Sequence, residues 1–169
     1  MNRKAIIFGI KTYNLTNKEK ALFKKEKPWG IILFSRNIKN IEQLKKLISD
    51  IKSIFDDNKY PILIDQEGGK VSRINSIIDL NFFSQNFFSN LYRRDKNLFY
   101  IFYKIYINKV SDIFNEVGIN INTAPVLDVM VKKAHSIIGN RSFSTDAKLV
   151  SKIGGICVKT FSKNKIGTV

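Results

Sequence analysis

The 169-residue chain is long enough for one domain with a sizeable core, and 44% hydrophobic residues with 12% aromatics exclude a disordered composition. The formal charge is +15, from 29 Lys and Arg against 14 Asp and Glu. Because the basic residues are spread along the whole chain and no nucleic-acid motif accompanies them, we interpret this charge as a compositional bias and expect no nucleic-acid partner.

The cysteine content and the apolar segments indicate the cellular compartment of the protein. Cys157 is the one cysteine, so no internal disulfide can form, and we expect a core residue in a protein of the reducing cytoplasm. Residues 1–10 have a charged start but too short an apolar run for a signal peptide. Residues 98–107 are interrupted by Lys104 and fall short of a bilayer span. We therefore expect no membrane helix and no membrane partner.

The first half of the chain alternates short apolar runs with longer polar segments. Residues 5–10, 30–34 and 61–65 are apolar runs that predict strands, and a charged stretch over 18–27 separates the first two. Between the second and third strands, apolar residues recur at helical spacing, which predicts an amphipathic helix. These residues are Ile41, Leu44, Ile48, Ile51 and Phe55.

The second half continues the alternation less clearly. Residues 74–88 have no clean period and predict a loop with a short helix, whereas 95–116 predict a helix that stops at Gly118. Residues 120–129 predict a strand with an irregularity at Pro125. Ser144, Thr145 and Asp146 can cap a last helix whose apolar positions are Val150, Ile153, Cys157 and Phe161, and residues 166–169 predict the start of a fifth strand.

This order of elements predicts an α/β fold with a parallel sheet. A doubly wound sheet would be compact at this length. A (β/α)8 barrel of the TIM type would be present only as roughly its first four βα units. No linker or internal repeat divides residues 1–169.

Polar residues recur where the predicted strands end, which is where ligands bind in parallel sheets. Asp65 and Arg73 follow the third strand and are the first candidates for a site. Carboxylates accept hydrogen bonds from neighbouring hydroxyls, and an arginine fork donates several at fixed angles, so this chemistry suits a polyhydroxylated ligand. Residues 35–37, Asp128 and the 139–144 loop belong to the same predicted edge.

Several of these residues also have purely structural interpretations. Glu67 and Asp128 can orient loops or pair with cations, and Arg141 can be a structural anchor. Gly68 and its neighbour Gly69 can form a turn or admit a ligand close to the backbone. The only histidine, His135, has no defined partner in its lysine-rich segment, so we do not assign it a catalytic role.

Four segments in order resemble the N-terminal barrel of glycoside hydrolase family 3, and within it the bacterial β-N-acetylhexosaminidases. They are Gly30-Ile-Ile-Leu-Phe-Ser-Arg-Asn37, Ile64-Asp-Gln-Glu-Gly-Gly-Lys-Val-Ser-Arg73, Ala124-Pro-Val-Leu-Asp-Val129 and Ile138-Gly-Asn-Arg-Ser-Phe-Ser144. The resemblance covers essentially the whole chain. It implies a TIM-type barrel and retaining hydrolysis of terminal β-linked N-acetylglucosamine from peptidoglycan recycling fragments, without a cofactor or a metal.

Site roles follow from the same resemblance. Asp65 matches the family carboxylate that grips sugar hydroxyls, and Arg73 and Arg141 match its sugar-binding arginines. Lys70 stands where arginine is common, and Asn140 replaces the usual acid. A saccharide or muropeptide that contains N-acetylglucosamine is the implied partner.

The family's catalytic residues lie beyond the point that matches Val169, so we expect residues 1–169 to be an N-terminal part of the barrel that is inactive alone. An open sheet edge would then favour self-association or pairing with a complementary barrel half. Two alternatives stay open: a noncatalytic carbohydrate-binding protein and a family 3 β-glucosidase.

Overall fold

The computed structural model describes residues 2–131 and 137–169. Five strands form one parallel sheet in the sequential order β1-β2-β3-β4-β5. Their bounds are β1 Lys4–Gly9, β2 Pro28–Leu33, β3 Ile62–Ile64, β4 Ile121–Asn122 and β5 Gly167–Thr168. Parallel neighbours that follow one another in the chain require a crossover at every step, which is how a (β/α)8-type barrel begins.

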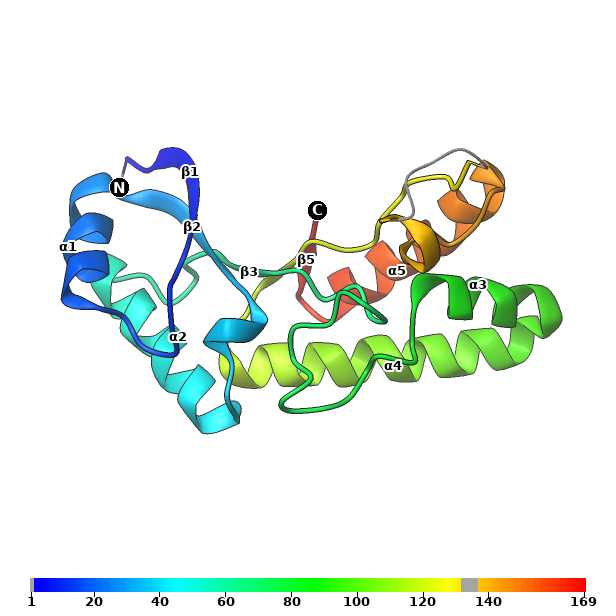
Figure 1. Ribbon diagram of the computed structural model, residues 1–169, viewed down its shortest axis with the longest axis horizontal. Coiled ribbons are helices and arrows are strands. Elements are labelled where there is room, and N and C mark those ends of the chain that lie inside the picture. The colour runs from blue at the N-terminus through cyan, green and yellow to red at the C-terminus, as the bar shows by residue number, and fades with distance from the viewer. Residues whose placement is uncertain (1, 132–136) are drawn as a thin grey trace.

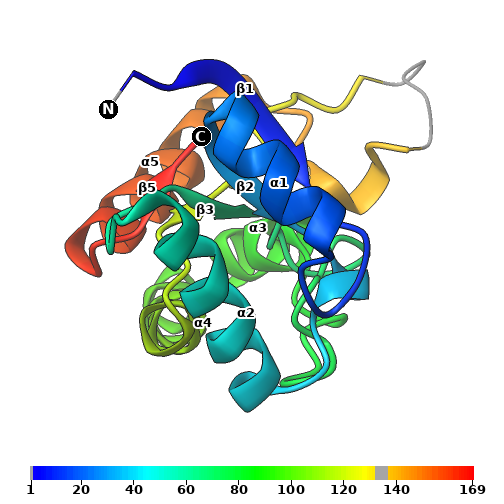
Figure 2. The same ribbon diagram turned by 90° about the vertical axis from the view of Figure 1, so that its left-hand side faces the viewer.

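Helices supply these crossovers. The helices are α1 Asn17–Glu26, α2 Ile41–Phe55, α3 Gln85–Arg94, α4 Lys96–Val117 and α5 Ala147–Lys163, with short 3-10 turns η1 Ser35–Asn37 and η2 Gly139–Arg141. Figure 1 shows α1 and α2 at one end of the molecule and α3 at the other, with the long α4 running between them. Figure 2 shows α2, α4 and α5 in an arc outside the sheet, with α4 in the middle. The fold is α/β and is a portion of a (β/α)8-type barrel, as the sequence predicts.

Helix ends follow local sequence signals. Thr16 and Glu19 form a reciprocal capping box at the start of α1. Asn40 caps α2, and the buried residues of this helix include Leu44, Ile48, Ile51 and Phe55, which confirms the predicted apolar face. Gly118 ends α4 in the left-handed conformation at φ 92°, again as predicted.

The last helix and the sheet enclose the core. Asp146 caps α5 by accepting from the Lys148 N–H, and Val150, Ile153, Cys157 and Phe161 are buried on its inner face. All of β3 is buried, as are Ile31 and Leu33 of β2. This hydrophobic core lies between the sheet and the arc of helices. The carboxyl ends of the strands lie outside it and are followed by polar loops. Within residues 2–131 and 137–169, no helix has both the length and the apolarity to cross a membrane.

Two sequence predictions need correction. The predicted strand over 120–129 is reduced to Ile121–Asn122, because Pro125 has no N–H for a ladder and the Val126 N–H donates instead to the Gln85 side chain at 3.2 Å. The peptide bond between Ala124 and Pro125 is cis. The expected loop and short helix over 74–88 is a loop followed by the ten-residue α3, which extends to Arg94.

Candidate functional site

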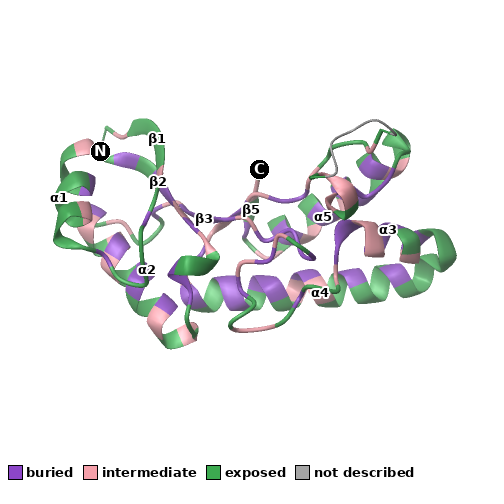
Figure 3. Ribbon diagram, viewed as in Figure 1, coloured by how far each residue is buried: buried purple, intermediate pink, exposed green. Residues whose placement is uncertain are grey.

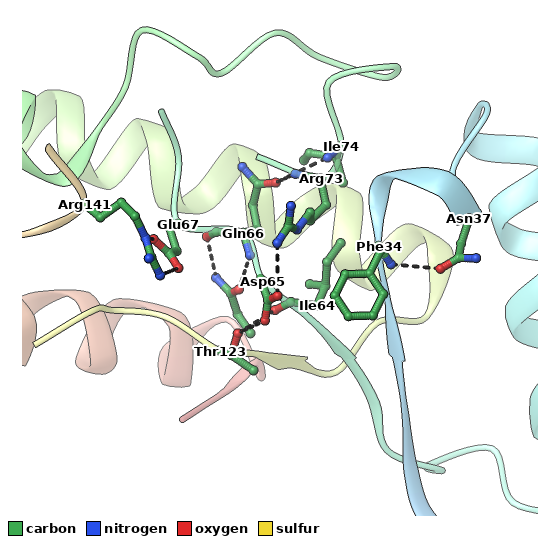
Figure 4. Close-up of polar contacts among 11 residues, drawn as sticks. Phe34, Asn37, Ile64, Asp65, Gln66, Glu67, Arg73, Ile74, Thr123 and Arg141 are labelled. Atoms are coloured by element: carbon green, nitrogen blue, oxygen red, sulfur yellow. Dashed lines mark hydrogen bonds and ion pairs between the residues drawn. The ribbon is translucent and has the colours of Figure 1, made fainter. Parts of the chain in front are cut away.

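The centre of the site is Asp65, which directly follows the buried strand β3. The Thr123 hydroxyl, just beyond β4, donates to Asp65 Oδ1. Arg73 Nη2 contacts Asp65 Oδ2 at 3.3 Å, and both side chains keep about a quarter of their surface exposed. Figure 4 shows Asp65 between Thr123 and Arg73 at the carboxyl end of β3. The carboxylate is therefore oriented from two sides while part of it stays accessible.

A buried glutamine holds the loop that carries Arg73. Gln66 Oε1 accepts from the backbone N–H groups of Arg73 at 2.8 Å and Ile74 at 3.3 Å, and Gln66 Nε2 donates to Ser72 Oγ at 2.9 Å. The Asn122 side chain pairs with the Gln66 backbone in both directions, at 3.0 and 3.1 Å. These amides satisfy a buried backbone that has no regular partner strand, and they fix Arg73 relative to Asp65.

The glycine pair allows a close backbone approach within the protein itself. Gly68 has φ 87° and Gly69 has φ 60°. A Cβ at Gly68 would lie 2.2 Å from the Phe83 carbonyl oxygen. Of the two interpretations of this pair, the turn is the one that the structure supports, because the Phe83 backbone fills the space beside Gly68.

A second ion pair lies beside the first. Arg141 Nε and Nη2 donate to Glu67 Oε2 and Oε1, each at 2.8 Å. The Glu67 side chain is 5% exposed and that of Arg141 is 25% exposed. The hydrogen bond to Glu67 raises the pKa of Arg141, so its guanidinium is charged at every physiological pH. Figure 4 shows this pair at the carboxyl end of β3, the same end at which Asp65 lies.

The segment around Arg141 is tied to α3 by another buried amide. The Gln85 side chain donates to the Arg141 carbonyl and accepts from the Val126 N–H at 3.2 Å. One side chain at the start of α3 thus joins the loop after β4 to η2. Sequence reasoning missed Gln85, because a glutamine in an aperiodic, aromatic-rich segment carries no local signal.

The end of β2 contributes an aromatic ring and one more arginine. The Arg73 guanidinium lies 5.6 Å from the Phe34 ring centroid and that of Arg36 lies 4.4 Å from it. Asn37 is fully buried and donates to the backbone carbonyls of Ile10 and Thr12, so its role is to hold the β1 loop. Arg36 Nε also donates to the Ile10 carbonyl, at 3.0 Å, so Arg36 and Asn37 both contact the loop after β1.

The predicted site residues therefore form two pairs at one edge of the sheet. Asp65 contacts Arg73, whereas Arg141 contacts Glu67, which sequence reasoning treated as an open case. Asp128 is exposed and its backbone carbonyl accepts from the Ser142 hydroxyl. His135 lies outside the described residues. Within the described ranges, no group of three or more His, Cys, Asp or Glu residues could hold a metal ion.

This arrangement can bind a neutral, polyhydroxylated ligand. A partly exposed carboxylate accepts from hydroxyl groups, the adjacent guanidinium donates, and Phe34 offers an apolar face nearby. The fold and site together define an α/β-barrel portion with a polar site at the carboxyl ends of its strands.

Comparison with known protein families identifies the family of this chain. Residues 4–169 match the model of the glycosyl hydrolase family 3 N-terminal domain, so the chain belongs to glycoside hydrolase family 3.

Individual relatives point the same way. A β-hexosaminidase of Neisseria gonorrhoeae is 30% identical over 163 residues, which are 95% of this chain and 44% of the relative. β-Hexosaminidase A of Pseudoalteromonas piscicida is 34% identical over 78% of this chain and 22% of its own length. The crystal structure of native NagZ from Neisseria gonorrhoeae superposes with a TM-score of 0.86 at 28% identity, over 98% of this chain and 48% of that one. The chain thus spans less than half the length of these relatives.

Proposed function

We propose that the protein is a family 3 glycoside hydrolase that cleaves terminal β-linked N-acetylglucosamine with retention of configuration. In this proposal residues 1–169 are an N-terminal part of the barrel domain that precedes the catalytic segment. The observation that carries it is the partly exposed Asp65 carboxylate, held between Thr123 and Arg73 at the carboxyl ends of the strands. The names of the relatives support the substrate class.

The proposed roles follow from the geometry. Asp65 accepts hydrogen bonds from sugar hydroxyls, Arg73 donates beside it, and Arg141 donates from the second pair. Retaining hydrolysis needs a nucleophile and an acid that protonates the leaving oxygen. On the basis of the resemblance to family 3, we propose that both catalytic groups lie on polypeptide beyond Val169, and that Asp65 and Glu67, which contact arginines, are not among them.

The proposed substrate is a saccharide or muropeptide with a terminal N-acetylglucosamine, released during peptidoglycan recycling in the cytoplasm. One solved relative, with a TM-score of 0.82 and 28% identity, is NagZ from Neisseria gonorrhoeae in complex with N-trifluoroacetyl-D-glucosamine. The buried, unpaired thiol of Cys157 is compatible with a reducing compartment.

The sheet is proposed to continue past β5. β5 pairs with β4 on one side through Ile121–Gly167 and Asn122–Thr168. A complementary barrel half, from the same protein or from a separate chain, would pair with the other side. Self-association through that edge is the alternative, and sedimentation of the gene product distinguishes the two.

The decisive experiment is on the native gene product. Its intact mass is measured first, and it is then assayed with the 4-nitrophenyl β-glycosides of N-acetylglucosamine and of glucose. Release from the N-acetylglucosaminide by a product longer than 169 residues supports the proposal. Preference for the glucoside would assign a family 3 β-glucosidase instead. Hydrolysis by a product that ends at Val169 would contradict the placement of the catalytic groups.

Carbohydrate binding without hydrolysis is the second candidate. It is favoured by one observation, that both carboxylates of the two ion pairs are already engaged by arginines. Binding of N-acetylglucosamine by calorimetry, with no turnover of either glycoside, would establish it.

A further inference from the structure

A polar pocket of about 370 Å³ lies between the C-terminal halves of α2 and α4. Figure 2 shows these two helices side by side. Because α2 leads into β3 and α4 leads into β4, the pocket lies at the amino ends of these strands, at the opposite edge of the sheet from the candidate site. Figure 3 shows buried and exposed bands alternating along α4, and at the pocket Val117 is buried whereas Glu116 is exposed. The pocket is therefore partly enclosed and still open to solvent.

Lys52 of α2 crosses this pocket toward α4. Its side chain is half-buried, and its Nζ lies 3.0 Å from the position that a Cβ would take at Gly118. Within residues 2–131 and 137–169, the Lys52 ammonium has no hydrogen bond and no ion pair. Lys45, at the rim of the same pocket, is instead paired with Glu116 at 2.8 Å. Lys52 is thus an amine in a pocket without a carboxylate partner of its own.

The surroundings of Lys52 favour its neutral form. The other charged residues that line the pocket are Lys45, Asp56, Asp57 and Glu116. Asp57 is paired with Arg3, and Glu116 is paired with Lys45, so both carboxylates are already engaged. Burial lowers the pKa of Lys52, and attraction by Asp57 opposes this effect only in part. A larger fraction of this side chain is therefore a neutral amine near neutral pH than for an ordinary lysine.

Completion of the barrel would leave this pocket open. Further βα units would join the sheet at β5 and close it at β1. α2 and α4 contact each other between those two edges, so the added units would lie beside other helices. A small reagent would then still reach Lys52 in the full gene product.

A neutral lysine amine is a nucleophile toward activated acyl groups, whereas an ammonium has no free electron pair. Acyl phosphates with short chains suit this pocket, since a volume of about 370 Å³ leaves room for a two-carbon acyl group and its phosphate. The net charge of +15 on the chain also favours the approach of an anionic donor over a neutral one.

We propose that Lys52 is a site of N-acylation by small acyl phosphates. The Nζ electron pair attacks the acyl carbon and forms an N–C bond, while the C–O bond to the phosphate breaks and its electron pair leaves with the phosphate. The nitrogen gives up a proton to water, and the product is an uncharged amide. The proposal goes beyond the proposed function and is independent of it, because Lys52 lies at the opposite edge of the sheet from Asp65.

The test is reaction of the folded, full gene product with acetyl phosphate, followed by peptide mass spectrometry that gives the acetylation rate of each lysine. Lys152 of α5 is the matched control. Its side chain is exposed, but the hydrogen bond with Tyr92 raises the pKa of Lys152 and keeps it charged. Accessibility alone would make Lys152 the faster of the two. We expect Lys52 to be acetylated at least about threefold faster than Lys152 at about pH 7.5.

Two further conditions separate the pocket from the local sequence. In guanidinium chloride the rate ratio of Lys52 to Lys152 should approach one, because unfolded lysines share a pKa of about 10.4. In the folded protein the ratio should fall as the pH rises to about 10.5, since Lys152 then loses its proton as well.

Two results would overturn the proposal. The first is acetylation of Lys52 no faster than that of Lys152 in the folded protein, which would mean that Asp57 and the carbonyl ends of α2 and α4 keep the ammonium charged. The second is an equal rate ratio in the folded and unfolded protein, which would assign the reactivity to neighbouring residues in the sequence and not to the pocket.

Discussion

Arg141 and Glu67 meet in a two-point ion pair although 74 positions separate them in the sequence. Glu67 lies in the loop after β3, and Arg141 ends the short turn η2 that precedes α5. The pair therefore fixes the distance between two loops at the carboxyl edge of the sheet. Glu67 is the carboxylate that holds Arg141 in the structure.

Glu67→Gln should destabilise the protein by about 1–3 kcal/mol, because it replaces a nearly buried carboxylate and weakens both hydrogen bonds to a charged group. Urea unfolding measures the change in the free energy of unfolding. Glu116→Gln is the matched control, since the Lys45–Glu116 pair has the same 2.8 Å distance but both side chains are about half exposed. The control should cost no more than about 1 kcal/mol. Equal losses of unfolding free energy in the two variants would show that the burial of Glu67 does not strengthen its ion pair.

Asp65→Asn should weaken N-acetylglucosamine binding by at least about tenfold, because hydrogen bonds from sugar hydroxyls to a carboxylate are worth about 1.5–3 kcal/mol each. The side chain is partly exposed, so stability should change little. Titration calorimetry of the full gene product measures affinity. Asp50→Asn, on the surface of α2, is the control and should bind normally. An unchanged dissociation constant for the Asp65 variant would remove Asp65 from the site.

The fold could be predicted wherever apolar spacing was regular. Residues 41–55 and the helix after Asp146 have clean helical periods, and their bounds and buried faces agree with the structure. The bounds of α3 could not be predicted, because its aromatic residues contact one another and α4 on several sides and leave no simple stripe. The strand over 120–129 was overextended, since an apolar run does not reveal that Val126 donates to a side chain.

The candidate site could be predicted only where its partners are close in sequence. Asp65 and Arg73 are eight positions apart, and both follow the same strand. The pairing of Glu67 with Arg141 depends on how two distant loops are packed. The buried amides of Gln66, Gln85 and Asn122 replace missing strand hydrogen bonds, and no sequence pattern marks a side chain that does so.

Gln85→Ala should destabilise the protein by about 1–3 kcal/mol, because the Val126 N–H and the Arg141 carbonyl would lose a buried partner. It should also weaken sugar binding, since it frees the segment that carries Arg141. Chemical unfolding and calorimetry measure the two effects. Asn90→Ala is the control, because this exposed residue of α3 bonds only to Asn86 through its side chain. A stable Gln85 variant with normal sugar binding would show that the amide does not position the loop.

Gly68→Ala and Gly155→Ala should have opposite signs. At Gly68 the positive φ and a Cβ position 2.2 Å from the Phe83 carbonyl oxygen force a backbone shift, which should cost about 2 kcal/mol or more. At Gly155, inside α5, an added Cβ meets nothing within 4 Å, so alanine should stabilise the helix by about 0.5–1 kcal/mol. Thermal unfolding of both variants measures the signs. Stabilisation by alanine at Gly68 would contradict the packing of the loop against Phe83.

Stability should fall at alkaline pH through the buried thiol of Cys157. Burial raises the pKa of this thiol to about 12, and it raises the pKa of the Tyr60 phenol to about 12 as well. An unfolded thiol ionises near pH 8.5, so between about pH 8.5 and 12 the folded state holds a proton that the unfolded state releases. The folded state therefore loses stability as pH rises through this window, and the loss is absent below about pH 8.

The comparison of the unmodified protein with Cys157→Ala isolates this effect. Alanine lacks the thiol proton and leaves the lysine charges unchanged. Tyr103 and Tyr106 interact with the thiol, but burial is the largest cause that raises the pKa of both phenols, so both stay protonated in the folded state of either protein over this pH range and their contributions nearly cancel in the difference between the two unfolding free energies. That difference should fall by about 2 kcal/mol between pH 8 and pH 10.5, in favour of the variant. Urea unfolding at both pH values measures it. A difference that stays constant would mean that the thiol has the same pKa in the folded and unfolded states. That result would contradict the burial of Cys157 in α5.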